Sequence, residues 1–361
     1  MTINYIKLKT FESNQNENEK NNNKSKIFNY GLAFLKSYLA FLVEISHNFN
    51  RNSTKNKIIL MITGQRIPHV PSFFIISFYF TCDNLLLISK TTFFKRLERL
   101  FIPYLIWPII IWIINRLLNL KYFGTFDYSY EFLKLQLLYG HMYMVQFWYL
   151  WDLIVITIVF KIIILIFKTN SLFILHIVLI VSYLTQYSGF GYKNIFLKYP
   201  YYKRYTFSRI FGMLPLAVTG FTLGIYKIIN IFQKRKIKTI FFSIVIYNIL
   251  NNYNIFVNQP AVNYYGINLN INAICVILIF SIFPSEKIKN KYIIKLFKFL
   301  TNYSAGIFYL HISIKHFLLP YFEDIKNGTF SGVIMNYLIC YLICFFGMLL
   351  FGRTRIKYLF S

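Results

Sequence analysis

Charge is scarce in this chain, and negative charge is the scarcest. Only 14% of the 361 residues are charged, and Lys and Arg outnumber Asp and Glu by 39 to 12. An ordinary globular domain carries about 25% charged residues. With 57% hydrophobic and 20% aromatic residues, the chain has too little polar surface to cover the core of a soluble protein of this size. The composition therefore excludes a soluble protein.

Cysteine is also rare. The four cysteines, Cys82, Cys275, Cys340 and Cys344, all lie in apolar stretches, which argues against a disulfide scaffold or a zinc site. The sequence shows no Walker, dinucleotide-binding or zinc-ligand motif and no internal repeat. A net charge of +27 would suit a nucleic-acid partner, but the apolar runs indicate that these cations flank membrane spans. No nucleic-acid partner is expected.

Long apolar segments are abundant instead. Each is about 17–23 residues long, enough for a helix to cross a hydrocarbon core of about 30 Å. The sequence therefore predicts an all-α, polytopic membrane protein with about ten transmembrane helices, in a cell (plasma) membrane. They are placed at 29–47, 71–89, 100–119, 147–167, 171–188, 208–226, 239–256, 267–284, 300–322 and 331–352.

The regions outside these spans define the domains and the orientation. Residues 1–28 are rich in Asn, Glu and Lys, a composition that predicts a disordered cytoplasmic tail. They lack the apolar core and the small-residue cleavage site of a signal peptide. Residues 29–352 form the membrane domain, and 353–361 form a short basic tail. With the N-terminus inside, the inner segments hold 23 Lys and Arg against 11 in the outer loops. This bias predicts that both termini are cytoplasmic.

The first predicted span carries three ionisable residues on one face. Lys36 and His47 are eleven residues apart, so on a helix they lie within about 20° of each other and about 16 Å apart along the axis. Glu44 precedes His47 by three residues, where a carboxylate can orient an imidazole or hold its proton. The plain alternative is that Lys36 extends to the membrane interface and His47 marks the end of the span. This span alone does not decide between them.

A basic pair precedes the third predicted span. Arg96 and Arg99 are one helical turn apart, a spacing that suits joint contact with phosphate. Basic clusters at the inner edge of a membrane also serve topology and lipid headgroups. The remaining ionisable groups inside spans are weaker candidates. Asp152 is as compatible with helix-to-helix hydrogen bonding as with a cavity, and a structural role is favoured for His311.

Six short motifs together resemble the acyltransferase-3 family of integral membrane acyltransferases, which includes bacterial polysaccharide O-acetyltransferases. They follow the family's order and cover Lys36 to Leu310, most of the chain. The family's Arg/Lys-x10-His signature is matched by Lys36 and His47, and its Arg-x-x-Arg pair by Arg96 and Arg99. The motifs are Lys36-x10-His47, Pro71 to Ser77, Arg96-x-x-Arg99 with Phe101 to Tyr104, Phe147 to Leu150, Leu214-Pro215 through Gly220 and Gly224, and Ser304 to His311.

The resemblance implies transfer of an acyl group, most often acetyl, from cytoplasmic acyl-CoA to a hydroxyl of a cell-surface or lipid-linked glycan. A neutral imidazole can take the hydroxyl proton during attack on the thioester. We therefore hypothesise that His47 is the general base and Glu44 its orienting carboxylate, with an acyl-His intermediate as a variant. Lys36, Arg96 and Arg99 would bind the phosphates of CoA. No metal is needed.

The chain departs from the family pattern at three positions. Phe78 stands where the family usually has Gly, Gln146 where a His is common, and Ile312 where Pro is frequent. These departures raise the prospect of a divergent acceptor or a degenerate enzyme. The main alternative function is an exporter or flippase of a glycan or lipid-linked intermediate. A third is a structural or sensory membrane protein without chemistry.

Overall fold

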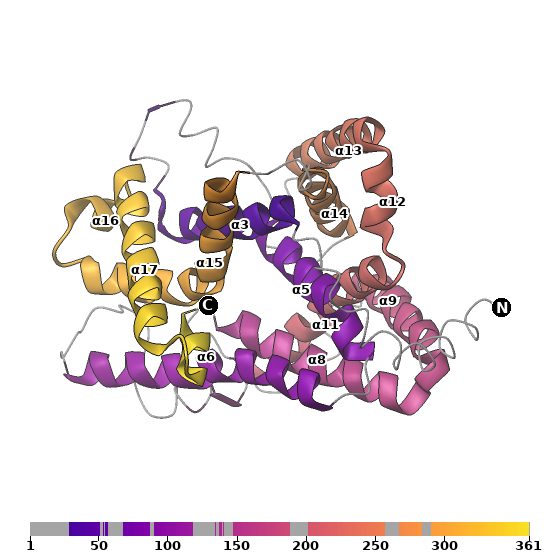
Figure 1. Cartoon of the computed structure of the whole chain (residues 1–361), viewed down its shortest axis with the longest axis horizontal. Helices are drawn as coiled ribbons and strands as arrows, with labels where there is room; N and C mark the ends of the chain where they lie inside the picture. Colours follow the sequence, from indigo (N-terminus) through magenta and orange to yellow (C-terminus); the bar gives the residue numbers. More distant parts are fainter. Residues whose placement is uncertain are drawn as a thin grey trace.

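The computed structural model is helical, with no strand in the residues that it describes (Figure 1). The predicted N-terminal tail 1–28 and Gln146 lie outside them. The described residues are 29–50, 53, 55–56, 68–86, 90–117, 134, 137–138, 140, 147–187, 201–256, 267–283 and 290–360.

Each of the ten segments predicted to be helical overlaps a long helix. By length and composition, three of the described helices are long and apolar enough to cross a membrane. A fourth span results if Arg209–Ile225 and Ile228–Lys234, which meet at a bend of 62°, cross together. The number of spans and the cytoplasmic termini therefore remain predictions. The helices are α3 (Tyr30–Asn48), α5 (His69–Leu86), α6 (Lys90–Leu117), α8 (Trp148–Phe167), α9 (Ser171–Tyr187), α11 (Tyr201–Ile225), α13 (Lys236–Phe256), α14 (Ile267–Ser281), α15 (Lys291–Leu318) and α17 (Phe330–Phe351).

Several helices begin before the predicted apolar segment. In α6 the difference is ten residues, so Arg96 and Arg99, predicted to precede the third span, lie on its helix. The polar first turns of α6 carry no apolar run and so escape a prediction based on hydropathy. The shorter elements were likewise not predicted. They are η2 (Lys168–Asn170), α12 (Ile228–Lys234), α16 (Glu323–Asn327) and η4 (Arg355–Leu359).

Side-chain caps define where three helices begin. Asn29 accepts a hydrogen bond from the third residue of α3, and Asn290 does the same for the first turn of α15. Thr329 caps α17. Such caps satisfy backbone N–H groups that have no partner inside the helix. Gly328, which ends α16 with a φ of 64°, supplies the left-handed conformation of a helix C-terminus.

Helices α5 and α11 approach each other closely along two glycines of α11. A Cβ atom on Gly220 would lie 2.2 Å from the carbonyl oxygen of Ile75, and one on Gly224 would lie 2.3 Å from the sulfur of Cys82. Only glycine permits this backbone contact, a device common between membrane helices. The contact holds α5, which carries Ser77, against the rest of the bundle.

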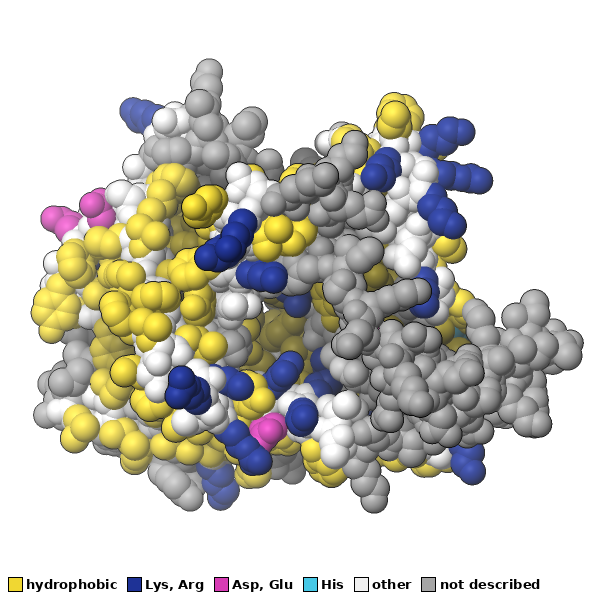
Figure 2. Space-filling model, viewed as in Figure 1, with side chains coloured by type: hydrophobic (Ala, Val, Ile, Leu, Met, Phe, Trp, Pro, Cys, Tyr) yellow, Lys and Arg dark blue, Asp and Glu magenta, His cyan; other side chains and the backbone are white. Residues whose placement is uncertain are grey.

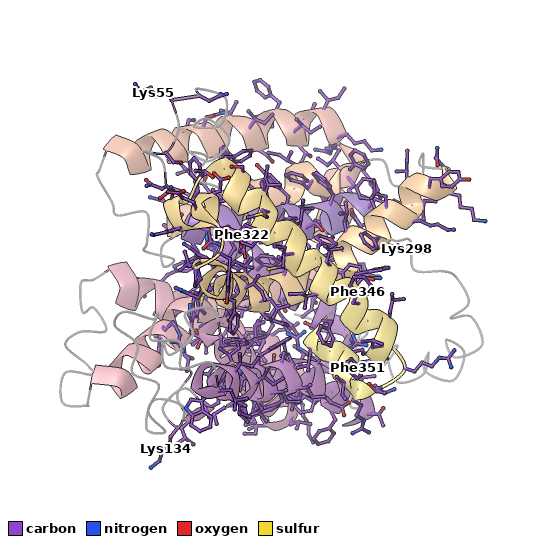
Figure 3. All side chains as sticks on the ribbon, turned by 90° about the vertical axis from the view of Figure 1, so that its left-hand side faces the viewer. Lys55, Lys134, Lys298, Phe322, Phe346 and Phe351 are labelled. Carbon is purple, nitrogen blue, oxygen red and sulfur yellow. The ribbon has the colours of Figure 1, made fainter. Side chains whose placement is uncertain are left out.

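The outward face of α17 is apolar. Phe346 and Phe351 project from this helix on the side nearest the viewer in Figure 3, and both are exposed. Leu338, Leu342 and Leu349 on the same helix are also exposed. An apolar face of this kind suits contact with lipid.

The C-terminal segment packs back onto the helices. The side chains of Leu359 and Phe360 are buried, and the indole Nε1 of Trp107 on α6 donates a hydrogen bond of 3.0 Å to the carbonyl oxygen of Leu359. Phe360 lies where a Cβ atom on Gly306 or Gly347 would collide with it. The end of the chain therefore lies beside α6, as its position in Figure 1 also shows.

Candidate active site

One continuous helix, α3, carries Lys36 and His47, and the two residues meet different neighbours. Helix α3 packs against α5, α14, α15 and α17. Lys36 contacts Phe80 of α5, whereas His47, in the last turn, contacts His311 of α15. With a rise of 1.5 Å per residue, the two ends of this face are about 16 Å apart. The candidate site therefore has a basic end and an imidazole end.

At the basic end, α3 and α6 bring two cations together. The Nζ atom of Lys36 lies 4.7 Å from the centre of the Phe80 ring, and the guanidinium carbon of Arg96 lies 5.3 Å from the centre of the Phe78 ring. Both cations therefore lie over aromatic rings of α5. In the described part of the chain neither of them forms a salt bridge with a carboxylate. Cations left without counter-charges can bind an anion.

The Arg96 side chain is held from two sides. Its Nε donates to the hydroxyl of Thr157 on α8 at 3.3 Å, and its Nη2 donates to the hydroxyl of Ser77 on α5 at 3.4 Å. A guanidinium has five N–H donors, so further donors remain for a ligand. Phe78 is fully buried beneath Arg96 and packs on Phe160. Its ring thus supports the cation.

Arg99 is exposed and meets the C-terminal segment. Its guanidinium carbon lies 5.6 Å from the centre of the Tyr358 ring, and Lys357 lies over the same ring. Arg355 forms an exposed ion pair of 2.7 Å with Glu98. Figure 2 shows Lys and Arg side chains around a hollow, above the stretch where α6 meets the C-terminal segment in Figure 1. The sequence did not predict that the tail adds cations here.

At the other end of α3, His47 faces α15. The centres of the His47 and His311 rings are 5.5 Å apart and the rings are tilted by 40°. The Nζ atom of Lys315 donates a hydrogen bond of 3.3 Å to the carbonyl oxygen of His47. The His47 side chain is exposed, whereas that of His311 is only 1% exposed. An accessible imidazole therefore lies directly beside a buried one.

Glu44 does not make the predicted contact. Its Oε1 accepts hydrogen bonds from the amides of Asn48 and of Asn336 on α17, the latter at 2.6 Å. The Asn336 amide also donates to the carbonyl oxygen of His311 at 2.9 Å. No hydrogen bond in the described residues joins Glu44 to the His47 ring. The buried carboxylate instead accepts from the amide donors within reach, and its role toward the imidazole stays a prediction.

A buried ion pair lies outside this face. Arg209 on α11 donates through Nε and Nη2 to the two carboxylate oxygens of Asp152 on α8, at 2.8 and 2.9 Å. Arg209 also donates to the carbonyl oxygen of Gly140 at 3.2 Å and lies over the Trp148 ring. Asp152 therefore joins two helices, one of the two predicted alternatives. The sequence did not indicate a role for Arg209, which lies at the edge of a predicted span, or for Asn336.

Comparison with known proteins supplies the family. The model of the acyltransferase-3 family, described as an acyltransferase domain, matches residues 29–353. No curated protein and no solved structure matches the chain. The match covers nearly all of the chain and includes both ends of the α3 face. The chain therefore belongs to the acyltransferase-3 family and is a membrane acyltransferase.

Proposed function

We propose that this acyltransferase moves an acetyl group from cytoplasmic acetyl-CoA to a hydroxyl of a cell-surface or lipid-linked glycan. The observation that carries the proposal is the arrangement on α3, where the cations Lys36 and Arg96 lie at one end and His47 lies at the other. A donor with phosphates at one end and a thioester at the other suits this arrangement.

The basic end is suited to the phosphates of CoA. Lys36 and Arg96 have no carboxylate partner among the described residues, and a phosphate provides the charge-assisted hydrogen bonds that arginine favours. Arg99 adds a third cation on the same helix as Arg96. The flexible arm of CoA would then run along α3 toward His47.

The imidazole end is suited to proton transfer. His47 takes the hydroxyl proton of the glycan as the oxygen bonds to the thioester carbonyl carbon. The carbon–sulfur bond breaks, and the proton passes from His47 to the sulfur of CoA. In the variant with an acyl-His intermediate, the His47 ring bonds to the thioester carbon and CoA leaves as its thiolate. The glycan oxygen then bonds to the acyl carbon, the bond from that carbon to His47 breaks, and the hydroxyl proton goes to the thiolate. Neither route needs a metal.

Radiolabelled acetyl-CoA tests the proposed reaction. Membranes that contain the protein, supplied with [¹⁴C]acetyl-CoA, are expected to form labelled glycan, and membranes without it are not. Mass spectrometry of the glycan identifies the acyl group. Passage of unmodified glycan across sealed vesicles without incorporation of label would contradict the enzyme and support the exporter or flippase.

Replacing Arg96 with alanine is expected to raise the KM for acetyl-CoA by about 10- to 100-fold with a smaller change in kcat. A hydrogen bond to a charged group contributes about 1.5–3 kcal/mol, and each 1.4 kcal/mol is about tenfold in affinity. The measurement is the initial rate against donor concentration. Lys95→Ala, an exposed cation on the same helix, is the matched control and should leave KM unchanged. A KM effect on the acceptor alone would contradict a donor site.

A further inference from the structure

His311 has a ring nitrogen that the fold leaves unused. The side chain is 1% exposed, and its Nε2 is buried without a hydrogen-bond partner in the described residues. A buried polar atom without a partner is destabilising, so such an atom is unusual. The nearby His47 ring, 5.5 Å away between ring centres, points to the use of this nitrogen.

The other ring nitrogen of His311 determines its tautomer. Nδ1 lies 2.9 Å from the carbonyl oxygen of Phe308. A carbonyl oxygen only accepts hydrogen bonds, so Nδ1 must carry the proton. In the neutral ring Nε2 then has a lone pair and can only accept. His311 is therefore a buried acceptor whose free nitrogen needs a donor.

Both imidazoles are held in place by their backbones. The amide of Asn336 links the carbonyl oxygen of His311 to the carboxylate of Glu44 on α3. The ammonium of Lys315 binds the carbonyl oxygen of His47. These bonds tie α3, α15 and α17 together at the level of the two rings. The bonds therefore hold the two backbones that carry the rings at a fixed distance, and the exposed His47 side chain can still rotate.

We propose that His311 is a positioning residue that accepts a hydrogen bond from a ring N–H of His47 and so sets the tautomer of the general base. Two imidazoles joined by one N–H···N bond of about 3 Å have ring centres about 5 Å apart, and the observed 5.5 Å requires only a small rotation of His47. With one nitrogen donating to His311, the opposite nitrogen of His47 has the lone pair.

The proposal rests on the proposed function and adds one role to it. The hydroxyl proton of the glycan moves to the free nitrogen of His47, which becomes an imidazolium while the oxygen bonds to the thioester carbon. The N–H on the other side still donates to His311, whose lone pair stabilises this positive charge. The proton then passes from His47 to the sulfur of CoA as the carbon–sulfur bond breaks. His311 itself neither gains nor loses a proton.

Two replacements separate positioning from a structural role. Asparagine keeps a donor near Nδ1 for the Phe308 carbonyl but ends short of Nε2, whereas glutamine places an acceptor oxygen near Nε2. We expect His311→Asn to lower kcat by about 100-fold with the KM for acetyl-CoA unchanged. We expect His311→Gln to stay within about tenfold of the wild type. A larger loss of kcat in His311→Gln than in His311→Asn would overturn the proposal. A raised KM together with a lower yield of folded protein would overturn it as well, because it would indicate a structural role.

A measurement on the unmodified protein reads the tautomer directly and uses a variant only to assign the signals. In a ¹⁵N spectrum of histidine-labelled protein, the signals lost in either His311 variant assign that ring. We expect a protonated Nδ1 and an unprotonated, hydrogen-bonded Nε2. A protonated Nε2 overturns the proposal even where acetyl transfer is intact. Failure of acetyl transfer with the expected tautomer would instead count against the proposed function.

Discussion

Replacing His47 with alanine is expected to reduce acetyl transfer by at least about 10²- to 10⁴-fold, the usual contribution of a general base, with no loss of protein from the membrane. The side chain is exposed at the end of α3, so its removal leaves no large cavity in the core. Its carbonyl oxygen, which Lys315 binds, is unaffected by the replacement. The measurement is label transferred from [¹⁴C]acetyl-CoA per unit of membrane-inserted protein.

A second histidine provides the control. His176 on α9 bonds through Nδ1 to the carbonyl oxygen of Leu172 and lies near Tyr226, away from the contacts of His47. His176→Ala should keep most of the activity. If His47→Ala keeps an activity near that of the wild type, His47 is not the general base. Label that remains on His47 after the acceptor is withheld would select the acyl-His route over direct transfer.

The helices of this fold were predictable because their signal is local. An apolar run long enough to cross a bilayer is visible in any single segment, and each of the ten predicted segments overlaps a helix. Their starts were less predictable, since the first turns of α6 and α15 are basic and polar. A cap such as Asn290 marks these starts better than hydropathy does.

The site was predictable only in part. Helical periodicity places Lys36 and His47 on one face, because it depends only on spacing along α3. The partners depend on how helices pack, and spacing does not contain that information. His311 beside His47, and Thr157 beside Arg96, come from α15 and α8. Glu44 shows the same limit, since its spacing favoured His47 but α17 offers it Asn336.

Separating the buried ion pair is expected to cause the largest loss of stability. Arg209 and Asp152 are 1% and 0% exposed. Removal of one partner of a buried pair leaves an uncompensated charge and costs about 3–5 kcal/mol. Asp152→Ala and Arg209→Ala should each lower the thermal unfolding temperature in detergent and the yield of folded protein. Arg355→Ala, which removes an exposed pair with Glu98, is the control and should cost less than about 1 kcal/mol.

The double replacement shows whether the loss of stability comes from the charge that a single replacement leaves unpaired. Asp152→Leu combined with Arg209→Met removes both charges and keeps apolar volume, a change that is often neutral in a protein interior. The double variant should therefore be more stable than either single variant, with a coupling energy of about 0.5–3 kcal/mol. Because α8 also carries Thr157, which binds Arg96, the single variants should raise the KM for acetyl-CoA as well. Equal stability of the single and double variants would show that the pair contributes packing and not charge compensation.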